Sequence, residues 1–305
     1  MKYLFWRRSF IALLVFVGVE LSLRIVGFGN IPVYYVSNQY EYALEPNQHM
    51  TRFGNTIHIN AAGMRSDGLK MGEKRILKFG DSVLHGGVAT DQSELSSQLL
   101  ENELKLQQPN VRVLNVSAGS WGPDNAFAWM QKHSDFNAIA VVLVFGSHDW
   151  QDQMTFRKVV GRVPFYPDSK PALAISDCAQ WLYSRWFSEV NWDELEENKD
   201  ANYKRGKFNR GWQQFIDYCN RKNLPLLVYH HANMEEVENK SWSKKGARLE
   251  AFLAENNVAV ISGLKSGMDK DDFRDKIHLN PSGQRKLADA LGPTLQEFLA
   301  ISNAE

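Results

Sequence analysis

The sequence predicts an α/β fold in which one parallel sheet is covered by helices on both faces. Two observations lead to this fold class. Short apolar runs suited to strands alternate with helix-like stretches through residues 73–305, which is typical of parallel strands joined by helical crossovers. The composition, with 44% hydrophobic and 23% charged residues, is that of a folded globular domain and argues against a disordered chain.

The predicted elements follow one another in a regular order. We expect strands at Arg75–Phe79, Val111–Val116, Ala138–Phe145, Leu224–Tyr229 and Val258–Ile261. We expect helices at 93–106, 124–134, 206–222, 243–256 and 281–300, the last of which opens with the start signal Asn280, Pro281 and Ser282. In a sheet of this kind, ligands gather at the carboxyl ends of the strands.

The segment 1–30 predicts a membrane anchor. Its basic residues Lys2, Arg7 and Arg8 come before an apolar run from Phe10 to Val19. Basic residues on this side keep the N-terminus in the cytoplasm and send the following chain across the membrane. The sequence therefore predicts a single-pass protein of the inner (cytoplasmic) membrane, with its domain facing the periplasm or the cell exterior.

Two charged residues, Glu20 and Arg24, interrupt the apolar segment. They are four residues apart, so they share one face of a helix and can pair near the far interface.

Because no small-residue cleavage site follows, an uncleaved anchor is favoured. A cleaved signal peptide and a buried helix of a cytosolic protein are the alternatives. Outside the cytoplasm, Cys178 and Cys219 could oxidise to one disulfide.

The remainder divides into a connecting segment and a domain. Residues 31–72 are polar with little periodicity, and we expect them to pack on the domain as a connection from the membrane. The domain spans 73–305. Its stretch 150–205 is rich in proline and aromatic residues and breaks the alternation, so it is predicted to be a cap beside the active site. A satellite hydrophobic cluster or an oligomer contact is the alternative.

The charge balance narrows the class of partner. The 305 residues include 35 basic and 35 acidic side chains, so the formal net charge is zero. Binding to nucleic acid requires a clear excess of basic residues, and no such partner is expected. The net charge is +3 within 1–30 and −3 beyond it. A mildly acidic domain favours a neutral or esterified glycan as substrate over a polyanion.

Two short motifs carry candidate catalytic residues. The first predicted strand ends in Gly80-Asp81-Ser82, which places a serine hydroxyl at the ligand edge after a sharp turn. Directly before the last helix stand Asp275 and His278, three residues apart. An aspartate so placed can orient the imidazole, whose other nitrogen can take a proton from the serine.

The order and placement of these motifs resemble the SGNH/GDSL hydrolase superfamily over about residues 73–300. The resemblance implies a three-layer α/β/α, flavodoxin-like fold and Ser-His-Asp chemistry on esters. By the same resemblance, Ser82 would be the nucleophile, His278 the general base and Asp275 the orienting carboxylate. This reading requires no cofactor and no metal ion.

The family's oxyanion hole implies three donors: the backbone N–H of Ser82, a residue after the second strand, and a side chain after the third strand. Gly119 and Ser120 both remain candidates for the second donor. The third comes from a Gly-x-Asn-Asp block, which here reads Gly-Ser-His-Asp, so His148 replaces the asparagine. A neutral or charged histidine can still donate. A structural histidine in a weakened site is the alternative.

Other residues near these blocks are candidate substrate contacts. They are Asp81, His85, Trp121, Asp149, Trp150 and His230. Tryptophans can stack on sugar rings, although most of them serve in packing. A metal site built from histidines such as His85, His148, His230 and His231 is disfavoured because the chain has no ligand spacing that supports one.

The main functional hypothesis is a serine esterase that removes O-acyl groups, chiefly O-acetyl groups, from an extracytoplasmic or exported bacterial polysaccharide. Membrane-anchored proteins of this family that face outward are similar to enzymes of that kind. One alternative is an O-acyltransferase, in which the acyl-serine passes its acyl group to a sugar hydroxyl. The other is a non-catalytic, membrane-tethered subunit that works with polysaccharide synthesis or export proteins.

Overall fold

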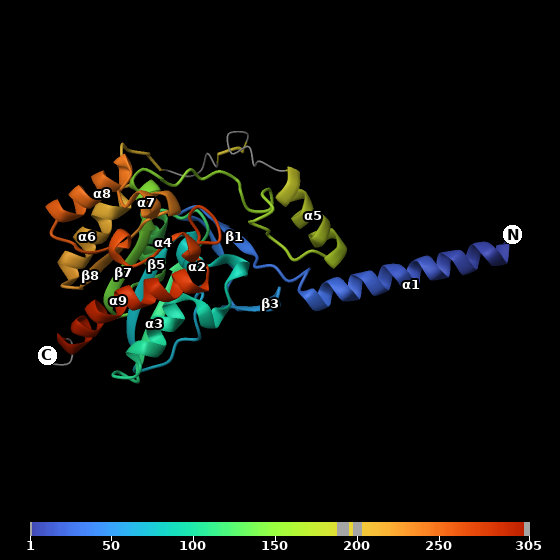
Figure 1. Ribbon diagram of the computed structural model, residues 1–305, viewed down its shortest axis with the longest axis horizontal. Helices are drawn as coiled ribbons and strands as arrows, with labels where there is room; N and C mark the ends of the chain where they lie inside the picture. The colour runs from blue at the N-terminus through green and yellow to red at the C-terminus, as the bar shows by residue number, and fades with distance from the viewer. Residues whose placement is uncertain (1, 188–194, 198–202, 302–305) are drawn as a thin grey trace.

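The computed structural model describes residues 2–187, 195–197 and 203–301 (Figure 1). Its centre is a parallel sheet of five strands in the order β6-β5-β7-β8-β9, with β5 and β7 in the middle. The strand bounds are β5 Lys74–Gly80, β6 Val111–Ser117, β7 Ala138–Gly146, β8 Leu226–His231 and β9 Ala259–Ser262. The predicted parallel sheet is confirmed, and all five strands lie within two residues of their predicted positions.

Helices cover both faces of the sheet, as an α/β layer arrangement requires (Figure 1). One face packs against α4 (Pro123–His133), α6 (Gly211–Lys222) and α8 (Lys244–Glu255). The other packs against α2 (Ser82–His85), α3 (Ser96–Leu104) and α9 (Pro281–Ile301). Side chains along each strand alternate between these two cores because successive residues of a strand point to opposite faces. The predicted three-layer α/β/α architecture is confirmed.

Short elements that the alternating pattern does not predict complete the domain. Helix α7 (Met234–Asn239) follows β8, and its start is capped by Asn233, whose side chain accepts the Glu236 N–H at 2.9 Å. Single turns of 3₁₀ helix lie in the loops, at 87–89, 92–94, 147–150, 263–265 and 270–272. All but 92–94 lie in connections that follow the carboxyl ends of strands, where the candidate catalytic residues stand.

The segment 31–72 is more regular than predicted. It forms two antiparallel hairpins, β1 (Tyr34–Ser37) with β2 (Glu41–Leu44), and β3 (Gln48–Arg52) with β4 (Asn55–Ile59). Their inward side chains join the core on the α4, α6 and α8 side of the sheet. The sequence did not predict these strands because they are only four or five residues long, too short for alternation to stand out.

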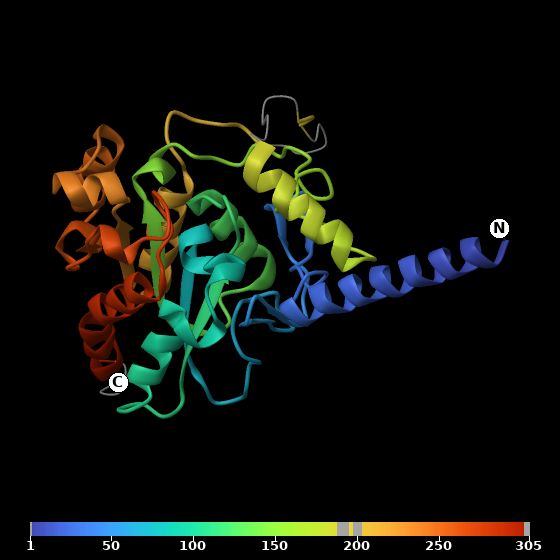
Figure 2. The ribbon, with the colours of Figure 1, turned by 45° about the vertical axis from the view of Figure 1, so that its right-hand side comes forward.

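The stretch 150–205 is described at residues 150–187, 195–197 and 203–205, and the rest of the predicted cap lies outside the described residues. Its first part, to about residue 167, packs against the β1–β2 hairpin and the loop after β6. It then forms α5 (Ala174–Phe187), which contacts α1 (Lys2–Val26) beside the point where α1 meets the domain (Figures 1 and 2). Cys178 on α5 and Cys219 on α6 are both free, so the disulfide considered above is not formed.

Candidate active site

Ser82 is the first residue of α2, immediately beyond the carboxyl end of β5. The turn between them leaves no room for a side chain at Gly80, where a Cβ atom would lie 2.7 Å from the carbonyl oxygen of Val144. Asp81 caps α2 by accepting the backbone N–H of Val83 at 2.8 Å. The glycine and the cap together present the Ser82 hydroxyl at the edge of the sheet.

Ser82, His278 and Asp275 form one continuous hydrogen-bonded chain. The Ser82 hydroxyl lies 2.9 Å from Nε2 of His278. On the other side of the ring, Nδ1 of His278 lies 2.8 and 2.9 Å from the two carboxylate oxygens of Asp275. With the proton on Nδ1, the ring donates to Asp275 and its Nε2 accepts from the serine. This is the nucleophile, base and orienter geometry that serine activation needs.

The carboxylate of Asp275 is held in its charged form. Partial burial opposes the charge, but the carboxylate accepts the backbone N–H groups of His278 at 2.9 Å and Ile277 at 3.0 Å as well as the His278 ring. These hydrogen bonds outweigh the burial and lower the pKa of Asp275 below its usual value. A charged Asp275 can stabilise the imidazolium that forms when His278 takes a proton.

Two arginines that the sequence reasoning missed hold the loops of this site together. Arg65, fully buried, donates to the carbonyl oxygens of His85, Gly87 at 2.6 Å and Thr90 at 2.7 Å, which lie just after Ser82 in the chain. Arg274 donates to the carbonyl oxygen of Gly86 at 3.0 Å and directly precedes Asp275. It therefore connects the nucleophile loop to the loop of the general base. No local sequence motif marks either arginine.

His231 also holds the loop that carries Asp275 and His278. It is 1% exposed at the end of β8, and its Nε2 lies 2.9 Å from the carbonyl oxygen of Ile277, next to His278. Burial lowers the pKa of His231 to about 4, more than the Ile277 carbonyl and nearby Asp81 raise it. The neutral ring therefore donates its Nε2–H to Ile277 at neutral pH and positions the loop that carries the general base.

The loop after β6 offers backbone donors beside the nucleophile. Ser120 is exposed and has a φ of +56°, a left-handed conformation that glycine adopts without strain and serine at some cost. Tyr166 donates its hydroxyl to Ser120 Oγ at 3.0 Å, and Tyr42 donates to the Gly119 carbonyl oxygen at 2.8 Å. Within the residues described, neither Gly119 nor Ser120 gives its backbone N–H to an acceptor. Both amides stay candidates for an oxyanion.

His148 lies in the 3₁₀ turn that follows β7 and faces two carboxylates. Its Nε2 is 3.6 Å from Asp81 Oδ2 and 3.5 Å from Asp149 Oδ2, and its side chain is 43% exposed. The negative charge of Asp149 raises the pKa of His148 most, burial lowers it, and Asp81 raises it further, to about 10. Burial also raises the pKa of Asp149 well above its usual value, so His148 and Asp149 compete for one proton. Because Nε2 faces the carboxylates, Nδ1 is the nitrogen left for another acceptor.

Asp149 is a structural acceptor in this arrangement. It is fully buried and its Oδ2 accepts the backbone N–H of Gly146 at 2.7 Å, which caps the turn. Asp81, His148 and Asp149 offer ligand atoms within 4.8 Å of one another, a spacing that also suits a small cation.

The structure gives the two tryptophans near these blocks packing roles in place of the predicted substrate contact. Trp121 is 2% exposed, and its indole N–H donates to the carbonyl oxygen of Tyr42 at 2.9 Å. Trp150 stacks on Phe208, with ring centroids 5.1 Å apart and planes 18° from parallel. The positions of these tryptophans in the sequence, next to the catalytic blocks, gave no sign that both rings pack against the protein.

His85 and His230 are likewise buried, so the predicted substrate contacts are corrected for them too. His85 Nδ1 accepts the Gly87 N–H at 3.2 Å, and burial, with Arg65 and Arg274, puts the pKa of His85 well below its usual value. His230 stacks on a tryptophan of the α7–α8 connection and bonds to an α8 glutamate and to Ser147, whose Oγ lies 3.2 Å from Nε2. Ser147 thus faces His230, and the consecutive Ser147, His148 and Asp149 form no relay.

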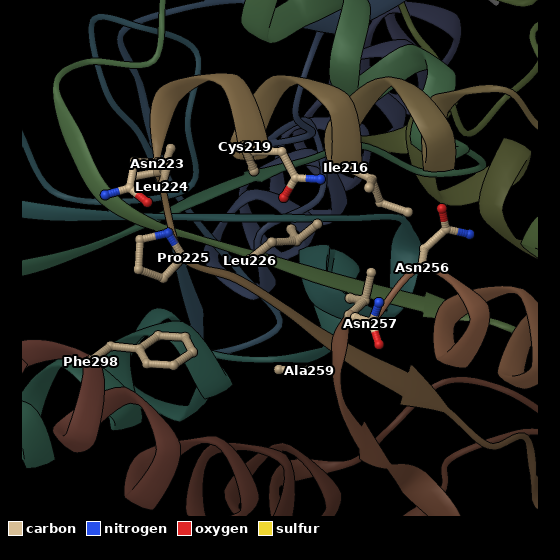
Figure 3. A pocket seen from close by; sticks show the side chains of 12 residues that line it. Ile216, Cys219, Asn223, Leu224, Pro225, Leu226, Asn256, Asn257, Ala259 and Phe298 are labelled. Atoms are coloured by element: carbon tan, nitrogen blue, oxygen red, sulfur yellow. The ribbon is translucent and has the colours of Figure 1, made fainter.

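A cavity of about 370 Å³ lies at the opposite edge of the sheet from Ser82 (Figure 3). It is bounded by Cys219, Asn223, Leu226, Asn257 and Phe298, among others. Leu226 begins β8, so this cavity lies at the amino ends of the strands, whereas the Ser82 chain lies at their carboxyl ends. The cavity is therefore separate from the candidate active site.

The chain matches no protein-family model and no curated protein. Its structure is similar to solved ester hydrolases at low identity. An acetyl xylan esterase, AlAXEase, is 17% identical, with 72% of this chain and 99% of that chain covered and a TM-score of 0.45. A lipase/acylhydrolase from Enterococcus faecalis is 13% identical, with 73% and 96% covered and a TM-score of 0.44. A lipolytic G-D-S-L family protein from Veillonella parvula is 13% identical, with 71% and 95% covered and a TM-score of 0.41. These identities and TM-scores are too low to assign a reaction to this protein, so its chemistry is argued below from its own side chains.

Proposed function

We propose that this protein is a serine ester hydrolase. The observation that carries the proposal is the chain from the Ser82 hydroxyl through the His278 ring to the Asp275 carboxylate, with distances of 2.9 and 2.8 Å. Residues almost 200 positions apart supply its two ends, and each is fixed by its own loop. A serine, a histidine and an aspartate that are hydrogen-bonded in this order activate the serine hydroxyl for attack on an acyl carbon.

The first half of the reaction forms an acyl-enzyme. Ser82 Oγ attacks the ester carbonyl carbon while His278 Nε2 takes the hydroxyl proton. The carbonyl oxygen becomes negative, and the backbone N–H of Ser82, with that of Ser120 or Gly119, donates to it. The ring of His148 is the proposed third donor to the same oxygen. His278 then passes its proton to the departing sugar oxygen as the carbon–oxygen bond breaks.

The second half of the reaction releases the acid. Water takes the place of the sugar, and His278 Nε2 accepts its proton as the oxygen attacks the acyl carbon. The same oxyanion donors stabilise the second tetrahedral intermediate. Collapse of that intermediate breaks the bond to Ser82, whose oxygen regains the proton from His278, and leaves the free carboxylic acid.

The accessibility of the site supports a small acyl group on a large carrier as the substrate. The side chains of His278 and Asp275 are 28% and 50% exposed. A polymer can approach such an open edge, whereas a long acyl chain would require an enclosed apolar channel. Together with the acidic domain, this supports O-acetyl esters of an extracytoplasmic or exported polysaccharide as the substrate class.

The contacts of α1 support a retained membrane anchor. Residues Phe5–Val26 form one helix long and apolar enough to cross a membrane. Its last turns belong to the folded domain: Glu20 accepts the backbone N–H groups of Ala174 at 2.8 Å and Ile175 at 3.0 Å, and Arg24 donates to a carbonyl oxygen of the same loop. Cleavage after the apolar segment would remove these contacts. The basic N-terminus places the domain on the outer side of the membrane.

Hydrolysis of an acetyl ester by the full-length protein in detergent tests the proposal. We expect turnover that is abolished in Ser82→Ala and reduced about 10²- to 10⁴-fold in Asp275→Asn, whose amide would hold His278 in the wrong tautomer. Equal turnover by wild type and Ser82→Ala would refute the proposal.

Acetylated glycan in place of free acetate would indicate transfer to a sugar. A folded protein that binds glycan but whose Ser82 is not labelled by a fluorophosphonate would indicate a non-catalytic subunit.

A further inference from the structure

The helix α5 carries an apolar stripe on its exposed side. Leu182, Tyr183 and Trp186 are 45%, 60% and 72% exposed, and with Ala179 they occupy positions i, i+3, i+4 and i+7. Residues at this spacing share one flank of a helix. The exposed polar Ser176 and Gln180 border this stripe next to Tyr183. An exposed apolar stripe beside polar residues is typical of helices that lie at a membrane surface.

The opposite side of α5 is fixed to the protein by polar and aromatic contacts. Asp177 is buried, accepts the Gly29 N–H at 2.7 Å and pairs with Arg52 at 2.5 Å. Trp181 lies edge-on to Phe28, with ring centroids 5.9 Å apart. Because this side is held, the rotation of α5 about its own axis is set, and the stripe has a fixed direction.

The position of α5 along the anchor helix α1 indicates that lipid covers the apolar stripe. The first residues of α5 are held by Glu20, which lies about 9 Å along α1 from Val26, at 1.5 Å per residue. On the free faces of α1, Leu21 and Ile25 are 56% and 86% exposed. If α1 spans the membrane, a bilayer that covers Leu21 and Ile25 extends to the level of Glu20.

We propose that α5 lies in the headgroup region of the bilayer that α1 spans, with Leu182, Tyr183 and Trp186 against the lipid. In both views α5 lies beside the domain end of α1 and runs obliquely to its axis (Figures 1 and 2). Tryptophan and tyrosine favour this interfacial region. With α1 and α5 both engaged, the catalytic domain has a fixed orientation on the membrane. This inference rests on the proposed anchor.

Spin labels on the full-length protein test the inference. In a background with Cys178→Ala and Cys219→Ala, single cysteines are introduced as Leu182→Cys and Trp186→Cys, with Gln107→Cys and Asn239→Cys on the exposed surface of the domain as controls. All four positions are exposed, so the fold should tolerate them. Each protein is placed in nanodiscs of phosphatidylcholine and phosphatidylglycerol, and the label's collision rates with oxygen and with a water-soluble nickel chelate are compared.

We expect the ratio of oxygen to nickel collisions to be several-fold higher at 182 and 186 than at 107 and 239. Equal ratios at all four positions would show a stripe in water and overturn the inference. Exclusion of both reagents at 182 and 186 would indicate a protein partner and also overturn it. A label at Val15→Cys reports the anchor separately: if it is accessible to nickel, the anchor itself fails, and the inference with it. Ester hydrolysis by the same samples shows whether the proposed activity stands independently.

Discussion

At the scale of single residues, the oxyanion role proposed for His148 depends on the proton that its ring carries. Nε2 of His148 lies 3.6 Å from Asp81 Oδ2 and 3.5 Å from Asp149 Oδ2. The charge of Asp149 raises the pKa of His148, and burial raises the pKa of Asp149, so this cluster shares a proton. A ring with its proton on Nδ1 can donate to a developing oxyanion.

We predict that His148→Ala lowers kcat for an acetyl ester by about 10²-fold, the usual effect of removing one oxyanion donor, with a smaller change in KM. His148→Asn restores a donor and should keep more activity than the alanine variant. Steady-state kinetics of the two variants checks this. A kcat for His148→Ala equal to that of wild type would assign His148 to structure alone.

The neutral state of His231 has a consequence for stability at low pH. Its pKa is about 4 in the folded protein and near 6.5 in an unfolded chain. Between these values the unfolded state binds more protons, so stability rises with pH and falls as the solution is acidified. The loss begins near pH 6.5 and is complete near pH 4, and it amounts to about 3 kcal/mol for this one group.

We therefore predict that His231→Gln makes the free energy of unfolding less dependent on pH between 6.5 and 4. The glutamine amide can still donate to the Ile277 carbonyl oxygen but takes up no proton. Urea titrations of both proteins at several pH values measure the difference. The idea fails if the two proteins lose stability in parallel on acidification.

At the scale of elements, α5 is attached through a buried ion pair. Asp177 and Arg52 lie 2.5 Å apart with side chains 7% and 4% exposed, and Arg52 also lies over the rings of Phe28 and Phe53. The pair links α5 to the β3–β4 hairpin. Removal of one partner from a buried pair leaves the other charge without compensation, which costs more than the pair contributes.

Asp177→Ala is therefore predicted to lower the free energy of unfolding by about 3–5 kcal/mol. Gln180→Ala, an exposed change three residues along the same helix, serves as the control and should have little effect. Denaturant titration in detergent followed by tryptophan fluorescence provides the measurement. Similar stabilities of the two variants would show that α5 is held by its other contacts.

The elements that the sequence predicted are those with a strong local pattern. The strands β5 to β8 are mostly buried apolar runs with clear ends, and α9 has both a start signal and a regular apolar face, so their positions could be derived. The hairpins in 31–72 and the helix α5 could not. Each is stabilised by residues far away in the sequence, such as Glu20 at the start of α5, and no local pattern reports such contacts.

At the scale of the whole molecule, the sheet brings the candidate site together. Ser82 follows the central strand β5, while Asp275 and His278 lie in the loop before α9, which covers the same face of the sheet as α2. The triad could be predicted because its two motifs stand at ends of elements that a parallel sheet places at one edge. The surroundings of His148 and the buried state of Trp121 could not, because they depend on side-chain directions set by the packed core.

The domain and the end of its anchor also form one structure. Phe28 is 7% exposed, Glu20 caps α5 and the Gly29 N–H bonds to Asp177, so the chain between residues 18 and 29 serves the domain as well as the membrane. Residues 2–17 make no comparable contact with the domain among the residues described. The two parts of the anchor should therefore differ in their effect on folding.

We predict that a chain beginning at Gly18 keeps the stability and the ester hydrolysis of the full-length protein in detergent. A chain that begins at Asn30 should melt at a lower temperature, because α5 loses both its cap and the aromatic partner of Trp181. Thermal unfolding of the two truncated proteins in the same detergent measures the difference. Equal melting temperatures would mean that α5 docks without residues 18–29, and α1 would then be only a tether, leaving the orientation of the domain on the membrane to α5 alone.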